Sequence, residues 1–237
     1  MKNAVVTISI GEFHERLALT THPQIRAYAD KIGADFIVLK STGLPIICYE
    51  KFQIRDLLDK YDRVFYIDSD VIVSPETPNI FELVPREMMG FLDESPLGYD
   101  QDFIEFLREY GRKFLSSWTM HRKCYNAGVF VCSREHREVF KLPEKLIKHH
   151  EDQSYLNLRL LEESTPIFEL PYQYNRMIYL DLVVKEHRLK SYIVHYAGFL
   201  EGRPIEECEK FLKKEYEMLV SQDFSKDDVK IGWATIT

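Results

Sequence analysis

Apolar and polar positions follow two alternating patterns over the first part of the chain. Short apolar runs at 4–10, 36–39 and 64–67 predict β-strands, because they are rich in β-branched and aromatic residues and end at polar residues. Between them, residues 12–32 and 49–60 carry the apolar spacing of helices. This strand–helix alternation predicts an α/β fold, with a mostly parallel sheet and helices on its faces.

The same patterns continue along the rest of the chain. Strands are predicted at 88–92, 129–132 and 193–195, a helix or loop at about 99–115, and helices at 134–150 and 152–163. A last helix starts after Pro204, with one apolar stripe formed by Ile205, Cys208, Phe211, Leu212, Leu219 and Val220. Since no repeat or linker interrupts the chain, we expect a domain over 1–203 and a helical extension over 204–237 packed on it.

Composition indicates a globular protein with a substantial core. Of the 237 residues, 45% are hydrophobic and 29% are charged. The net charge is −7, and acidic and basic residues are interspersed. This argues against a nucleic-acid-binding surface, for which a basic face is expected. It does not exclude a nucleotide ligand.

Cysteine usage and hydropathy bear on the cellular compartment. Four scattered cysteines, with no Cys-x-x-Cys pair, are expected to be reduced thiols: Cys48, Cys124, Cys132 and Cys208. No apolar run approaches the about 18 residues that span a bilayer. The apolar N-terminal stretch ends at Gly11, too early for a signal peptide. We therefore expect a cytoplasmic protein.

The triplet Asp68-Ser69-Asp70 follows the apolar run 64–67 directly. Two carboxylates one residue apart at a strand end can both reach a hard divalent cation. Acidic triplets also serve as turns and solvated strand ends, so the triplet alone is weak evidence. However, ligands of parallel sheets bind at the carboxyl ends of strands. Both this triplet and Gly11 lie at such ends.

Four other segments accompany the triplet in a fixed order. They are the first strand up to Gly11, the Asn126-Ala127-Gly128 turn, the Asp152-Gln153 pair followed by Leu156-Asn157, and His195-Tyr196-Ala197-Gly198. Over residues 4–203, this set resembles glycosyltransferase family 8. The resemblance implies a GT-A fold and a metal-dependent enzyme. Such an enzyme moves a sugar from a nucleotide-sugar, by family precedent a UDP-sugar, to a hydroxyl of a glycan, glycolipid or protein, with retention of anomeric configuration.

The resemblance also assigns metal ligands. They are Asp68, Asp70 and His195, a mixed oxygen and nitrogen set that suits Mn²⁺, with Mg²⁺ as the second candidate. A divalent ion bridging the diphosphate would neutralise the charge of the leaving group. Alternatively, His195 is a structural histidine, in the core or at a strand end, whose hydrogen bonds are all made within the protein.

Asp152 and Gln153 match the family's pair beside the anomeric carbon. Either residue could stabilise an oxocarbenium-like transition state or hold the acceptor, and the acid could equally serve as a helix cap. The donor-binding positions implied by the resemblance are Ile8, Ile10, Gly11, His14, Lys51, Ser69, Asp93, Asn126, Ala127, Gly128, Gly198 and Arg203. Among these, His14 is expected to stack on the base. The amide of Asn126 is expected to bond sugar hydroxyls.

The sequence departs from the family after the His-x-x-Gly motif. Many members carry a lysine there that holds the diphosphate, whereas this chain has Glu201 at that position. A carboxylate repels phosphate, so we hypothesise that Arg203 supplies the missing cation.

Three other readings are open to test. A haloacid-dehalogenase-type phosphatase would use the first aspartate of the triplet as nucleophile, but the following Val71-Ile72 does not fit that class. A non-catalytic nucleotide-sugar or carbohydrate-binding protein would keep the fold without needing the catalytic pair. Peripheral membrane attachment through the last helix is disfavoured, because its polar face mixes acidic and basic residues. The oligomeric state is not predicted.

Overall fold

The computed structural model describes residues 1–98, 100–116, 118, 122–146, 151–225, 227 and 229, apart from the side chains of 100, 102 and 151. A six-stranded sheet in the order β2-β1-β3-β6-β5-β7 runs through its centre. Its strands are β1 (Asn3–Ile8), β2 (Asp35–Leu39), β3 (Arg63–Ile67), β5 (Met89–Asp93), β6 (Tyr125–Ser133) and β7 (Ile167–Glu169). Of these six, β6 is antiparallel to its neighbours and the other pairs are parallel. The predicted mostly parallel α/β sheet is confirmed.

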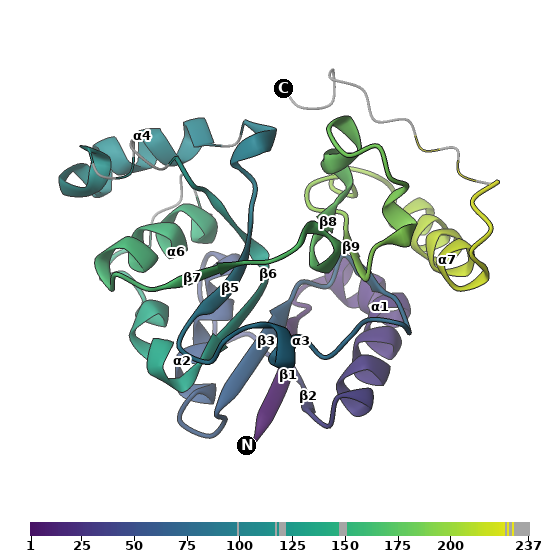
Figure 1. The fold of residues 1–237 in the computed structure, drawn as a ribbon, viewed down its shortest axis with the longest axis horizontal. Coiled ribbons are helices and arrows are strands. Elements are labelled where there is room, and N and C mark those ends of the chain that lie inside the picture. The colour runs from purple at the N-terminus through teal and green to yellow at the C-terminus, as the bar shows by residue number, and fades with distance from the viewer. Residues whose placement is uncertain are drawn as a thin grey trace.

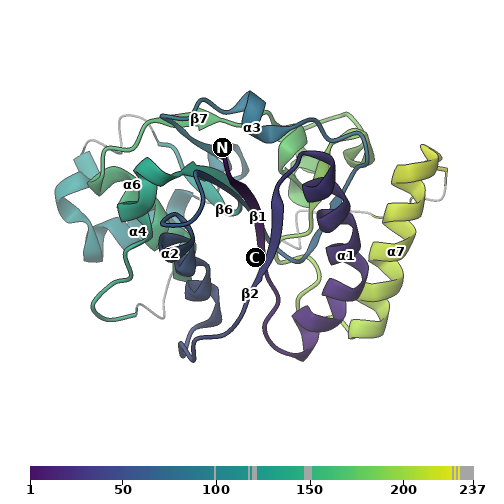
Figure 2. The same cartoon turned by 90° about the horizontal axis from the view of Figure 1, so that it is seen from below.

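Helices cover both faces of the sheet (Figures 1 and 2). Alternate residues of β3 point to opposite faces: Val64 and Tyr66 join one core cluster, and Phe65 and Ile67 join the other. The first cluster packs against α2 (Ile54–Leu57) and α6 (Glu151–Glu162), and the second against α1 (Glu12–Lys31). A strand buried on both faces is apolar at consecutive positions, which explains the continuous apolar run at 64–67.

A second, three-stranded sheet lies beside the carboxyl ends of β1 and β3. It has the order β4-β9-β8 and consists of β4 (Val71–Val73), β9 (Ile193–His195) and β8 (Arg176–Met177). β4 and β9 are antiparallel, and Val71 lies opposite His195. β9 was predicted, whereas β4, β7 and β8 were not. All four strands have only two or three residues, so the periodic signal of each is weak.

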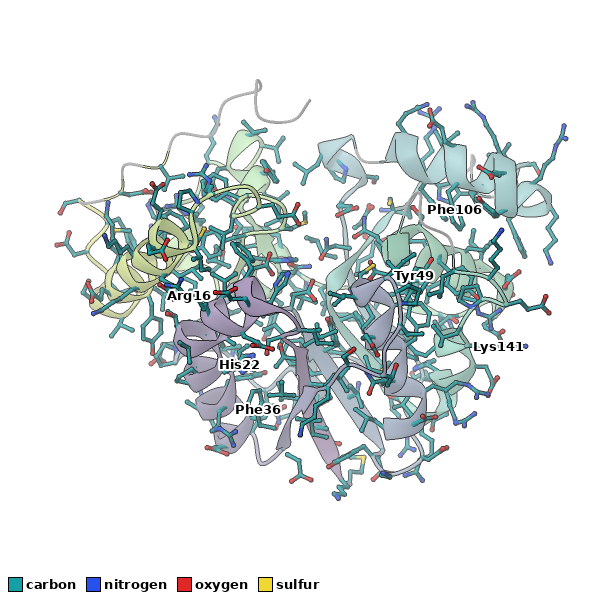
Figure 3. All side chains as sticks on the ribbon, turned by 180° about the vertical axis from the view of Figure 1, so that it is seen from behind. Arg16, His22, Phe36, Tyr49, Phe106 and Lys141 are labelled. Carbon is teal, nitrogen blue, oxygen red and sulfur yellow. The ribbon has the colours of Figure 1, made fainter. Side chains whose placement is uncertain are left out.

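The last helix, α7 (Ile205–Ser221), packs along α1 (Figure 2). Arg16 of α1 lies at this contact (Figure 3), where it binds Glu206 at 2.8 Å and Glu209 at 2.6 Å. The predicted stripe is confirmed at Cys208, Leu212 and Leu219, which are buried. The stripe was wrong at Val220, which is 54% exposed. Consecutive helical residues point about 100° apart, so the neighbour of Leu219 turns towards solvent.

Other helical predictions differ from the structure. Where one helix was predicted over 49–60, the structure has a 3₁₀ helix (Ile47–Gln53) followed directly by α2. The helix predicted over 134–150 is wrong: a 3₁₀ helix (Arg134–Phe140) is followed by non-helical chain to 146, and 147–150 lie outside the described residues. Pro143 explains the break, since it lacks an N–H and disfavours helix before it.

The described part of the chain also contains several shorter helices. The α-helices are α3 (Ile80–Leu83) and α4 (Asp100–Tyr110), and the 3₁₀ helices are Ser95–Leu97, Arg112–Phe114, Tyr172–Tyr174, Ile178–Leu182 and Arg188–Lys190. α4 falls within the predicted helix or loop at 99–115. Over the described ranges, no helix combines the length and apolar character needed to cross a bilayer.

Candidate active site

A cleft of about 700 Å³ opens at the carboxyl ends of β1 and β3. Most of the predicted site residues line it: Ile8, Ile10, His14, Lys51, Asp68, Ser69, Asp70, Asn126, Ala127, Gly128, Asp152, Gln153, His195 and Gly198. Gly11, Asp93 and Arg203 are not among the described residues that line it, and their contact with a donor stays a prediction. The fold thus gathers segments that are far apart in sequence into one site.

Asp68, Asp70 and His195 form a compact cluster in this cleft. Each offers a ligand atom, and the three atoms lie within 4.8 Å of one another. Nε2 of His195 is 3.4 Å from Oδ1 of Asp70 and 3.9 Å from Oδ2 of Asp68. Two carboxylates and an imidazole fit a divalent ion such as Mn²⁺. The pairing of β4 with β9 produces the cluster, because it holds the histidine beside the triplet.

Gly128 of β6 lies against the cluster. A Cβ at this position would come within 2.3 Å of Cε1 of His195 and 2.6 Å of Oδ2 of Asp68. The segment 126–128 was predicted as a turn, which is wrong: it belongs to β6, and the Gly128 carbonyl accepts the Asp68 N–H at 2.8 Å. The residues that flank the segment pair with neighbouring strands, Tyr125 with Asp93 of β5 and Val129 with Ile67 of β3. A glycine is required here for space.

The three clustered groups shift one another's protonation. Burial raises the pKa of Asp68, although Lys51 opposes this. Burial also opposes ionisation of Asp70, but His195 outweighs it and lowers the pKa of Asp70. Burial disfavours the imidazolium of His195, yet the two aspartates raise the pKa of His195 overall. Tyr66, which was not predicted, donates its O–H to Oδ1 of Asp68 at 2.5 Å.

Asn175 orients the imidazole of His195. The Gly128 N–H donates to Oδ1 of Asn126 at 3.0 Å, so the Asn175 group that bonds the same oxygen at 2.9 Å is its Nδ2. Oδ1 of Asn175 then faces Nδ1 of His195 at 2.9 Å. Nδ1 therefore carries the proton of the neutral ring, which leaves the Nε2 lone pair available to a metal.

Lys51 and Asp152 form a buried ion pair beside the cluster. Their charged atoms are 2.5 Å apart, and Nζ of Lys51 also donates to the Ala127 carbonyl at 3.1 Å. Burial alone would lower the pKa of Lys51, but the negative charges of Asp152 and Asp68 raise it. The predicted basic donor residue is thus protonated and linked to the predicted catalytic acid.

The side chain of Gln153 is held by Glu94. Oε1 of Gln153 accepts the Ala127 N–H at 3.0 Å, and its Nε2 donates to Oε1 of Glu94. Sequence reasoning selected the neighbouring acid, Asp93, which instead accepts a hydrogen bond from Lys123 at 2.8 Å. Because neighbouring positions at a strand end point in different directions, the two acids meet different partners. Adjacency to Asp93 was the one sequence signal for Glu94.

Ile8, Ile10, His14, Ala197 and Gly198 also line the cleft. Here Nδ1 of His14 hydrogen-bonds Oγ of Ser69 at 3.2 Å. Glu201 lines the cleft. Arg203 turns away, since its guanidinium lies 4.2 Å from the ring centroid of Phe199 and its Nε donates to the Phe199 carbonyl. The structure does not bring the hypothesised replacement cation into the cleft.

Comparisons with known proteins agree with this arrangement. The profile of glycosyl transferase family 8 matches residues 20–200. A glycosyltransferase involved in glycosylation of the major capsid of PBCV-1 has a similar fold, with a TM-score of 0.59, 14% identity, and coverage of 90% of this chain and 100% of that one. The bifunctional glycosyltransferase WbbM has a TM-score of 0.54 and 15% identity over 91% of this chain and 52% of its own. No curated protein matches the sequence.

The family match covers most of the chain and includes the aspartate triplet, the Asn126–Gly128 segment, the Asp152-Gln153 pair and His195. The similar solved structures have the GT-A glycosyltransferase fold that the sequence predicted. The chain therefore belongs to glycosyl transferase family 8 and is a glycosyltransferase of the GT-A fold.

Proposed function

We propose that this enzyme uses Mn²⁺ or Mg²⁺ to transfer a sugar from a UDP-sugar to a hydroxyl group of a glycan, glycolipid or protein, with retention of anomeric configuration. The observation that carries the proposal is the cluster of Asp68, Asp70 and His195 inside the cleft. The donor nucleotide and the retaining outcome follow family precedent. The four cysteines, which form no disulfide, agree with an enzyme of the cytoplasm.

The two aspartates and Nε2 of His195 would hold the metal. When bound, the ion would neutralise the charge that develops on the diphosphate leaving group. Lys51 forms an ion pair with Asp152 and places a positive charge in the wall of the same cleft. Ile8, Ile10 and His14 form the wall expected to hold the nucleoside, and Asp152 and Gln153 form the wall expected to face the sugar.

Binding provides the first test. The melting temperature is measured with nucleotide sugars, with and without Mn²⁺. A ligand at 100 times its Kd stabilises the native state by about 2.7 kcal/mol. For a chain of this size, that raises Tm by roughly 5–10 °C. We expect a UDP-sugar to produce this shift with Mn²⁺ and to lose it when the metal is chelated.

Asp70→Asn is the matched variant, since it removes one carboxylate charge with little change of shape. It should fold and show no metal-dependent shift. The anomeric configuration of the product, read by NMR, tests retention. If no nucleotide sugar shifts Tm in the presence of metal, the proposal is wrong.

A further inference from the structure

Glu94 is a buried carboxylate between two amide side chains. It is 1% exposed and lies just after β5. Nε2 of Gln153 donates to its Oε1, and Nδ2 of Asn126 donates to its Oε2 at 3.1 Å. The Cys124 thiol lies 3.7 Å from Oε1. Burial raises the pKa of Glu94 to about 7, although these hydrogen bonds oppose the rise.

Two backbone groups determine which way the amides point. A backbone N–H can only donate, so the Gln153 atom 3.0 Å from the Ala127 nitrogen is Oε1. By the same reasoning, the Asn126 atom 3.0 Å from the Gly128 nitrogen is Oδ1. Both NH₂ groups must then face Glu94. An ionised carboxylate only accepts hydrogen bonds, so it matches both donors.

These contacts determine which hydrogen-bonding groups of the Gln153 side chain are free to bind a substrate. Its Oε1 accepts the Ala127 N–H and also Nδ2 of Asn126 at 3.3 Å, which occupies both lone pairs of the carbonyl. Its Nε2 uses one hydrogen on Glu94. Within the described part of the chain, the second hydrogen has no partner, and Gln153 lines the cleft.

Building on the proposed function, we propose that Glu94 is a positioning residue that fixes Gln153 as a hydrogen-bond donor to a sugar oxygen in the cleft, with its carbonyl oxygen held away from the anomeric carbon. Gln153 then stabilises the reacting sugar through its N–H and does not attack it. Asn126 is also a positioning residue. Its side-chain amide hydrogen-bonds Glu94 and Asn175 and so holds both of them in place.

Glu94→Gln tests the positioning role. The new NH₂ group replaces one of the two carboxylate oxygens and therefore faces the NH₂ group of either Gln153 or Asn126. One amide must then turn, which leaves the Ala127 or Gly128 N–H unsatisfied. We expect kcat to fall about 100-fold, the typical cost of losing one aligned donor. The Kd for the UDP-sugar with Mn²⁺, measured by calorimetry, should stay near that of the wild type. Unchanged kcat in Glu94→Gln would overturn the proposal.

Glu50→Gln is the matched control. Glu50 is fully buried and accepts hydrogen bonds from Ser41 and Thr42, and it does not line the cleft. Both variants lose a buried carboxylate, so both should melt lower than the wild type. Only Glu94→Gln should lose kcat; an equal loss in Glu50→Gln would mean that destabilisation alone explains the effect.

The double variant Glu94→Gln with Gln153→Glu separates the two atoms of residue 153. In this variant the amide at position 94 donates to the carboxylate at position 153, which reverses the wild-type hydrogen bond. The hydrogen bonds with Asn126 and the Ala127 N–H can also form again, so Tm should recover towards that of the wild type. The double variant has no side-chain N–H donor at position 153, so transfer should remain low. Wild-type transfer in this variant would show that the reaction uses an oxygen at position 153, and would refute the proposal. Failure of the wild type to bind any UDP-sugar would instead refute the proposed function.

Discussion

Gly128→Ala should damage the metal cluster more than the fold. The added Cβ would lie 2.3 Å from Cε1 of His195 and 2.6 Å from Oδ2 of Asp68. Reaching ordinary contact requires the imidazole to move by about 1 Å. His195 is 1% exposed and its Nδ1 is tied to Asn175, so it has little room to move without breaking that bond.

The size of the effect follows from overpacking and from displaced ligands. Forcing a methyl group into a packed site costs about 1–3 kcal/mol, or roughly 2–12 °C in Tm for a chain of this length. Misplacing a metal ligand costs about 10- to 100-fold in metal affinity. We expect both losses, measured by a thermal melt and by Mn²⁺ titration followed by electron paramagnetic resonance.

Gly90→Ala is the matched control for this experiment. Gly90 lies in β5, and its added Cβ would meet Cγ2 of Val84 at 2.8 Å and Cδ2 of Leu170 at 3.2 Å, both apolar side chains. This variant should melt lower but bind Mn²⁺ as the wild type does. Wild-type Mn²⁺ affinity in Gly128→Ala would refute the reasoning, because it would place the ion away from Asp68 and His195.

Three other predictions concern the ion pairs. Lys51→Met should lower the free energy of unfolding in urea by about 3–5 kcal/mol, because it leaves Asp152 buried without its cation, and adding Asp152→Asn should recover part of the loss. Arg16→Ala should leave the urea unfolding midpoint close to that of the wild type, because its ion pairs with Glu206 and Glu209 are partly exposed to solvent. Burial opposes ionisation of Asp227, yet hydrogen bonds from Arg188 lower its pKa to about 2. The stability from that pair should be complete above about pH 4 and lost as the pH falls through about 2. Asp227→Asn should therefore weaken the fall in the free energy of unfolding between about pH 4 and about pH 2. An unchanged fall in this variant would show that the Arg188–Asp227 pair is not its cause.

Local patterns determined much of the fold. The strands β1, β2, β3, β5 and β9 and the helices α1, α6 and α7 were predicted within a few residues of their observed bounds. Their signals lie within each segment, as apolar spacing and polar ends, so no knowledge of distant contacts is needed. The order of short motifs likewise identified the family and most residues that line the cleft.

Other features depended on contacts between distant segments. Residues 126–128 lie within strand β6, whose flanking residues Tyr125 and Val129 pair with β5 and β3, although Asn-Ala-Gly is a typical turn sequence. No local signal distinguishes the outward Asp93 from the inward Glu94, or marks Asn175 as the partner of His195. Each of these outcomes depends on which group lies opposite in the folded chain.

The sequence by itself predicted most strands of the central sheet, the longer helices that cover it and the position of the acidic triplet at a strand end, because each signal lies in neighbouring residues. Only the tertiary structure decided how the side chains of the candidate site are arranged. Pairing of β4 with β9 brings His195 to the triplet, and two backbone N–H groups set the orientation of the amides around Glu94. Hydrogen-bond direction is a property of atoms in contact, and it exists only once the chain has brought them together.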